Sequence, residues 1–252
     1  MLPFVRIPHS TWLRCHKALT EAGLVGSFMV FLALMSVVLE YPGSALHHLL
    51  PWPVVRRCLM GLAAGASLAC VIYSPWGQRT GAHINPAVTL AMALIRRIRL
   101  RTTLLYITAQ LMGAMAGMAV AELLLGPYLA HPQVDHIATA PGEAGLSWAF
   151  AGELSFSFAL MTLILVLSSR PRWAPYTGVA VAVTVALFTA TAAPLSGMSM
   201  NPARTLGSAI FSQDWHHLWI YFVAPPLGML AAASLYVRLR RLRRVSHLPG
   251  GT

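Results

Sequence analysis

The sequence predicts an all-α membrane protein with six transmembrane helices and two re-entrant half-helices, arranged as an inverted 3+3 repeat. Three observations lead to this fold class: the composition, apolar segments of two distinct lengths, and a ten-residue pattern that occurs twice. Of the 252 residues, 57% are hydrophobic and 10% are charged, whereas soluble domains carry about 25% charged residues. The composition therefore argues against a soluble protein and favours an integral membrane protein.

Six apolar segments are long enough to cross a bilayer, which takes about 20 residues. They cover roughly 19–39, 55–75, 102–125, 148–168, 175–193 and 216–238. Two more, about 86–95 and 202–212, are too short to cross. A half-span of this kind is tolerated only where it is buried in protein or lines a watery cavity.

The basic residues predict the orientation. If each half-span returns to the side that it entered from, 15 of the 18 Lys and Arg residues fall on one side of the membrane: Arg6, Arg14, Lys17, Arg79, Arg96, Arg97, Arg99, Arg101, Arg170, Arg172, Arg238, Arg240, Arg241, Arg243 and Arg244. By the positive-inside rule this side is cytoplasmic. We therefore expect a plasma membrane protein, of the bacterial inner membrane type, with both termini and the basic tail 239–252 in the cytoplasm.

The net charge of +11 could also indicate a nucleic-acid partner. The basic clusters instead flank apolar segments and have no aromatic residues interleaved with them. We therefore expect the lipid bilayer, and no nucleic acid, as the partner of these charges.

The pattern Gly-x-x-x-Asn-Pro-Ala-x-Thr-Leu begins at Gly81 and again at Gly197. Each copy lies at the start of a half-span, and a loop-like connector near 127–147 separates the two copies. The chain 1–252 therefore forms a single channel domain with repeat halves at about 15–126 and 146–238. Because each half has three spans, an odd number, the second half is inverted relative to the first. Inverted repeats with broken helices are typical of transport proteins.

The two triplets are Asn85, Pro86, Ala87 and Asn201, Pro202, Ala203. Asn is favoured as a helix N-cap and Pro at the first helical position, so each triplet starts a half-helix. Two inverted half-helices bring their N-termini together, each with a charge of roughly +0.5. The two Asn side chains can then donate to a passing oxygen, while the positive potential repels cations and protons.

With these two triplets, the chain resembles the major intrinsic protein family of aquaporins and glycerol facilitators over roughly 15–238. The likeness includes Ala109-Gln110, Gly81-Ala82-His83, and the residues Glu21, Glu153 and Arg204. It implies a passive channel without a cofactor, assembled as a homotetramer. It also implies that Glu21, Glu153 and Gln110 support the pore loops, while His83 contributes its backbone carbonyl. From the residues alone, Glu21 and Glu153 could instead couple protons to transport.

The resemblance places an outer constriction at Gly65, Thr189, Met198 and Arg204. Water-selective relatives carry Phe and His at the first two positions, so Gly and Thr predict a wider pore. Glycerol facilitators have Asp directly after the arginine, where this chain has Thr205. We expect water and small uncharged solutes to pass, namely glycerol, urea, ammonia or neutral metalloid hydroxides, and protons and ions to be excluded.

Two of these assignments have structural alternatives. Gly65 could be a helix-packing glycine, in which case a register one residue earlier would bring Ala64 to the pore. Arg204 could be an interfacial arginine that extends its charge towards water.

Other function classes fit the sequence less well. A strictly water-selective channel is the main alternative, and a coupled secondary transporter would need an ion-binding acid where the second half-span offers a fixed cation. No Ser/His/Asp set, HExxH motif or phosphate-cradling loop lies in the spans, so we expect no enzyme activity. The three cysteines form no CxxC pair and the loop histidine pairs lack a third ligand, so we expect no metal site.

Overall fold

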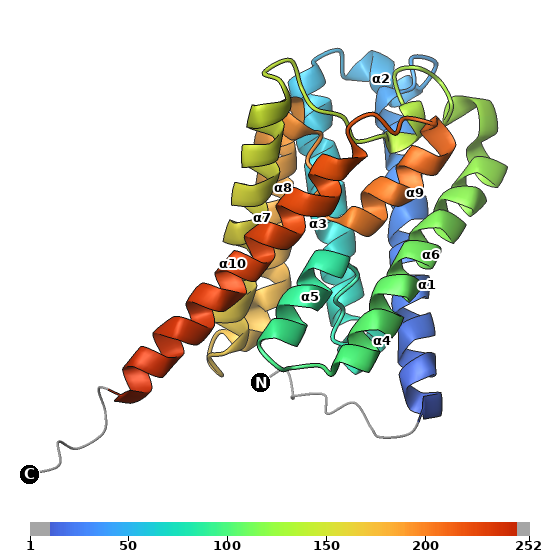
Figure 1. Ribbon diagram of the computed structural model, residues 1–252. Helices are drawn as coiled ribbons and strands as arrows, with labels where there is room; N and C mark the ends of the chain where they lie inside the picture. Colours follow the sequence, from blue (N-terminus) through green and yellow to red (C-terminus); the bar gives the residue numbers. More distant parts are fainter. Residues whose placement is uncertain (1–10, 246–252) are drawn as a thin grey trace, which may run out of the picture.

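The computed structural model describes residues 11–245, and every regular element in this range is helical (Figure 1). Six helices are long and apolar enough to cross a membrane: α1 (Thr11–Glu40), α3 (Pro53–Tyr73), α6 (Leu100–Leu125), α7 (Leu146–Ser168), α8 (Thr177–Ser196) and α10 (Leu218–Val245). The predicted fold class is confirmed. Arg6 and residues 246–252 of the expected basic tail lie outside the described residues.

Two helices are too short to cross, as expected: α5 (Pro86–Leu94) and α9 (Pro202–Ser212). Figure 1 shows them approaching each other from opposite ends of the bundle, with their N-termini in its middle. The connections contain two short helices, α2 (Ala45–Leu49) and α4 (Pro75–Thr80). They also contain three 3-10 turns: η1 (Gly126–Tyr128), η2 (Asp135–Ile137) and η3 (Ala174–Tyr176). The end of the bundle that carries α2 is called the outer face below, and the end where α1 begins is called the inner face.

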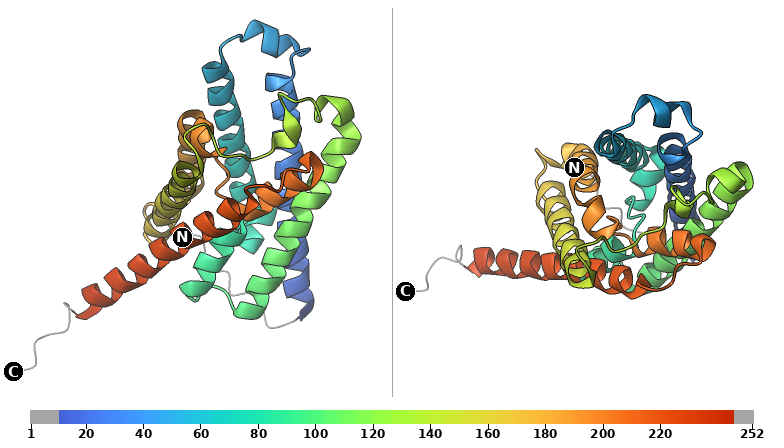
Figure 2. Two further views of the ribbon diagram at one scale, coloured as in Figure 1. Left: turned by 45° about the horizontal axis from the view of Figure 1, so that its top comes forward. Right: turned by 90° about the horizontal axis from the view of Figure 1, so that it is seen from above.

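Two long helices extend further than their apolar segments predict, both at the inner face. The helix α1 begins at Thr11 rather than near residue 19, and α10 continues to Val245 rather than ending near 238. The added turns are rich in basic and polar residues, which suit a helix that leaves the bilayer. In Figure 2 the last turns of α10, in red, extend away from the other helices.

Small residues set the distance between the long helices. The helix α1 packs along α6, α3 along α8, and α7 along α10. A methyl group added at Gly113 of α6 would lie 2.3 Å from the carbonyl oxygen of Ala22 in α1, and one at Gly228 of α10 would lie 2.2 Å from that of Leu154 in α7. Backbones can approach this closely only where the side chain is absent, as is common between membrane helices.

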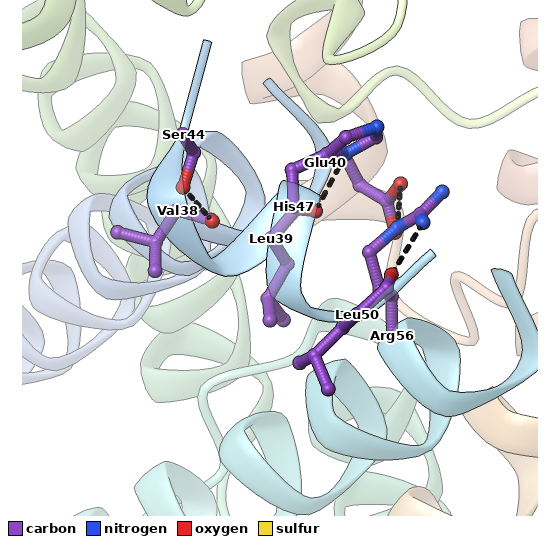
Figure 3. Close-up of polar contacts among 7 residues, drawn as sticks. All are labelled: Val38, Leu39, Glu40, Ser44, His47, Leu50 and Arg56. Carbon is purple, nitrogen blue, oxygen red and sulfur yellow. Dashed lines mark hydrogen bonds and ion pairs between the residues drawn. The ribbon is translucent and has the colours of Figure 1, made fainter. Parts of the chain in front are cut away.

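An ion pair fastens the outer connection between α1 and α3 (Figure 3). Arg56 Nε donates to the Glu40 carboxylate at 2.9 Å, and Nη1 of the same guanidinium donates to the carbonyl of Leu50 at 2.9 Å. His47 Nδ1 lies 3.1 Å from the carbonyl of Leu39. Because Arg56 is buried and paired, this outer-face arginine is neutralised within the fold.

We expect Gly113→Ala to destabilise the protein by about 1–3 kcal/mol, since the added methyl overpacks the contact between α1 and α6. The matched control is Gly23→Ala in α1, where an added methyl group would meet nothing within 4 Å. Thermal unfolding in detergent, followed by circular dichroism, measures both. Equal unfolding temperatures for the two variants would contradict the assignment of Gly113 to a close backbone contact.

Candidate functional site

A cavity of about 1030 Å³ extends from the outer face to the inner face. Glu40 and Arg57 line its outer end, and Arg97 and Arg240 line its inner end. Both triplets contribute to its wall between these ends, as do the segments that precede them. The predicted half-helices therefore line a cavity, which is the condition for short spans at membrane depth.

The two triplets are joined by reciprocal hydrogen bonds. Asn85 Nδ2 donates to the carbonyl of Met200 at 2.8 Å, and Asn201 Nδ2 donates to the carbonyl of Ile84 at 2.9 Å. Each asparagine thus binds the residue just before the other asparagine. These bonds fix the N-termini of α5 and α9 against each other.

The same side chains also cap their own helices. Asn85 Oδ1 accepts from the backbone N–H of Ala87 at 2.8 Å, and Asn201 Oδ1 accepts from that of Ala203 at 3.0 Å. A side-chain amide has two N–H groups, and the reciprocal bond uses one of them. Because both asparagines line the cavity, the second N–H of each can donate to an oxygen inside it.

The segments before the triplets adopt an unusual backbone conformation. Ala82 and Ile84 have φ values of 47° and 43°, and Met198 and Met200 have values of 51° and 50°. A positive φ is strained for residues other than glycine, and it is rarest for branched ones such as Ile84. The two segments repeat the same alternation, so both halves of the chain need an interaction that holds this backbone in place.

Glu21 of α1 provides that interaction in the first half. Its carboxylate accepts from the backbone N–H of His83 at 3.1 Å and of Ile84 at 2.7 Å. Gln110 Nε2 donates to the same carboxylate at 2.8 Å and to Thr89 Oγ1 at 3.0 Å. The His83 ring takes part as well, since Nδ1 lies 3.2 Å from Thr89 Oγ1. These contacts form one buried polar network behind the cavity wall.

Glu153 of α7 has the corresponding contacts in the second half. It accepts from the backbone N–H of Ser199 at 2.9 Å and of Met200 at 2.7 Å, and from the Ser196 hydroxyl at 2.8 Å. Both glutamates are fully buried, and neither lines the cavity. Their oxygens are engaged by the protein backbone rather than turned towards the cavity.

Sequence reasoning missed a pair of tyrosines that repeat this symmetry. Tyr106 donates its hydroxyl to the carbonyl of Thr80 at 3.1 Å, and Tyr221 donates to that of Ser196 at 2.8 Å. Thr80 and Ser196 each come directly before the glycine that opens the ten-residue pattern. Aligning the two halves on that pattern would have revealed the tyrosines, because Tyr106 follows Thr80 by 26 residues and Tyr221 follows Ser196 by 25.

Three of the four residues predicted for the outer constriction line the cavity: Thr189, Met198 and Arg204. The Arg204 guanidinium donates to the hydroxyl of Thr139, a residue of the connector between the two halves. Thr139 was not among the predicted residues, because a loop has no periodicity that would reveal its contacts. The connector thus holds the arginine at the cavity wall.

Gly65 does not line the cavity, so its place in the constriction has to be corrected. A methyl group on Gly65 would lie 2.3 Å from the carbonyl oxygen of Ala182, which makes Gly65 a packing residue between α3 and α8. Ala64 lines the cavity instead. Gly61 is a packing residue as well: its added methyl would lie 2.5 Å from the carbonyl oxygen of Ala186 and 3.2 Å from Thr189 Cβ, and Gly61 does not line the cavity. Counting back from Asn85 reaches Gly65 but does not reveal which side of α3 packs against α8 and which faces the cavity.

We expect Glu21→Ala to lower the unfolding temperature, because it leaves two buried backbone N–H groups without an acceptor, at about 1–3 kcal/mol each. Glu143→Ala is the control, since Glu143 is an exposed acid of the outer connector. Thermal unfolding in detergent measures the difference. A Glu21→Ala protein as stable as the control would rule out a bracing role for this carboxylate.

Comparisons with known proteins agree with this geometry. A family model described as "Major intrinsic protein" matches residues 9–236. Aquaporin NIP6-1 of Arabidopsis thaliana is 36% identical over 180 residues, which cover 71% of this chain and 57% of that protein. Aquaporin-4 of Rattus norvegicus is 34% identical over 211 residues, which cover 82% of this chain and 64% of that protein. The chain thus matches less than two thirds of the length of these relatives.

Among solved structures, the aquaglyceroporin from Plasmodium falciparum has the same fold. It superposes with a TM-score of 0.74 at 20% sequence identity and covers 92% of this chain and 99% of its own. At this identity the likeness concerns the fold alone. Together with the family match over most of the sequence, it leads to one conclusion: the chain belongs to the major intrinsic protein family and is an integral membrane protein.

Proposed function

We propose that the protein is a passive channel for water and small uncharged solutes that excludes protons and ions. The observation that carries this proposal is the pair of reciprocal bonds between Asn85 and Asn201 inside a cavity that extends between both faces. A solute oxygen that accepts from both asparagines has its own protons turned away from the centre. The two helix N-termini add a positive potential that opposes the entry of cations.

The shape of the wall favours a wide pore. Thr189 and Ala64 present small side chains to the cavity, and Met198 adds a flexible apolar surface to the same lining as the charged Arg204. A polyol or urea needs such a mixture of donors and apolar wall. The relatives named above include aquaporins and an aquaglyceroporin, which is consistent with either solute range, so a strictly water-selective channel remains the alternative.

The contacts of the buried acids speak against a coupled transporter. Glu21 and Glu153 accept backbone N–H groups and lie outside the cavity lining. A coupling acid has to meet the transported ion, and these two are occupied by the fold. We also propose that the inner face is cytoplasmic, that the membrane is a bacterial inner membrane, that the chain assembles as a homotetramer, and that it has no enzyme activity and no cofactor.

The test is stopped-flow light scattering on proteoliposomes that contain the full chain. We expect fast shrinkage in sucrose, and fast reswelling when glycerol or urea supplies the gradient. A pH-sensitive dye inside the vesicles should report no proton leak above that of empty vesicles. Fast water flux with both solutes excluded would favour the strictly water-selective alternative, and water flux equal to that of empty vesicles would refute the channel.

We expect Thr189→Phe to reduce glycerol flux at least several-fold more than water flux, because a ring at this position narrows the cavity beside Arg204. The matched control is Thr191→Phe, two residues further along α8, where the side chain is exposed and does not line the cavity. Both fluxes are measured in the same vesicles. Equal losses of water and glycerol flux in Thr189→Phe would remove Thr189 from the constriction.

A further inference from the structure

Four arginines line the inner end of the cavity. Arg96 and Arg97 come from the connection between α5 and α6, while Arg240 and Arg241 come from the last turns of α10. The helices α5 and α10 pack against each other, which brings the two pairs to the same mouth. Figure 1 shows α10 passing beside α5 before its last turns extend beyond the bundle. Other inner-face arginines do not line the cavity, among them Arg79, Arg99, Arg101, Arg170 and Arg172. Orientation in the membrane therefore does not by itself require arginines at the mouth.

Two of these guanidinium groups donate hydrogen bonds to hydroxyl groups nearby. Arg97 Nη1 donates to Ser168 Oγ at 3.2 Å. Arg240 Nη1 donates to the Tyr236 hydroxyl at 3.2 Å, and its guanidinium lies 5.5 Å from the centre of the same ring. Burial lowers the pKa of Arg97, and the charge of Arg240 lowers it further, while Tyr236 raises it. Arg97 and Arg240 are therefore close enough to repel each other.

The chain supplies no side-chain carboxylate at this mouth. Five of its seven acids, Glu40, Glu122, Asp135, Glu143 and Asp214, belong to outer-face segments, and Glu21 and Glu153 brace the two pore segments. The C-terminal ends of α5 and α7 point towards the inner face, but a helix end offers only about half a negative charge and acts within its last turn. Four full positive charges at one cavity mouth thus favour an anion from outside the chain.

We propose that the inner mouth is a binding site for a phosphate-bearing anion, which blocks the pore when bound. A planar guanidinium matches phosphate oxygens with two parallel hydrogen bonds, and Ser168 and Tyr236 line the same end of the cavity with hydroxyl groups. The phosphate comes either from a lipid headgroup of the adjoining leaflet or from a soluble phosphate. The blocking effect rests on the proposed channel function, whereas the binding does not.

Binding is tested first on the full chain in neutral detergent, by calorimetry with inorganic phosphate against chloride at constant ionic strength. We expect phosphate to bind, and Arg97→Gln and Arg240→Gln each to weaken it about tenfold, as the loss of one charge-assisted contact implies. Arg170→Gln is the control, because Arg170 is exposed at the same face but absent from the cavity lining. Equal weakening by Arg170→Gln, or equal binding of chloride, would overturn the site.

Vesicles then separate the two sources. If the source is a lipid, phosphatidic acid in a phosphatidylcholine bilayer lowers water flux through the wild-type chain but not through the Arg97→Gln/Arg240→Gln double variant. If the source is soluble, inorganic phosphate lowers flux in pure phosphatidylcholine. Flux unchanged by either would overturn the blocking effect. A wild-type chain that conducts nothing in any vesicle would refute the channel, while calorimetry still decides the anion site.

Discussion

Two helix N-termini that point at each other inside a membrane define this structure. Their partial charges are alike, and the surroundings offer little water to screen them. The reciprocal bonds of Asn85 and Asn201 resolve the conflict, since each amide joins its own helix cap to the carbonyl that precedes the other helix. The positive potential that this contact retains is the basis of the proposed exclusion of ions.

The contact depends on a backbone that would not hold its shape alone. Non-glycine residues with positive φ precede both triplets, and each such residue costs about 1–3 kcal/mol unless its surroundings enforce it. Glu21 and Glu153 enforce it from α1 and α7. These helices are in turn fixed by glycine-mediated packing against α6 and α10. The strained backbone before the triplets is therefore held by the two glutamates, whose helices are themselves held by packing against α6 and α10.

How much the sequence could predict follows from the range of each interaction. The triplets carry their own local signal, because an N-cap and a first-turn proline define a helix start within a few residues. The side of α3 that faces the cavity has no such local signal, because it depends on packing against α8, which is distant in the sequence. Gly65 accordingly packs against α8, while its neighbour Ala64 lines the cavity. Thr139 reaches Arg204 across the connector, and no periodicity in the sequence reveals such a contact.

The two halves match in backbone but differ in the side chains that support it, and this difference bears on their roles. In the first half Gln110 and Thr89 extend the Glu21 network, whereas in the second half Pro225 stands four residues after Tyr221, as Gln110 stands four after Tyr106. A proline has no side-chain donor, so Glu153 relies on the Ser196 hydroxyl instead. The second half also carries Arg204, and this arginine interacts electrostatically with Glu153. Its bracing acid therefore also stabilises the charge of Arg204. This relates the support of the pore segment to the selectivity proposed for it.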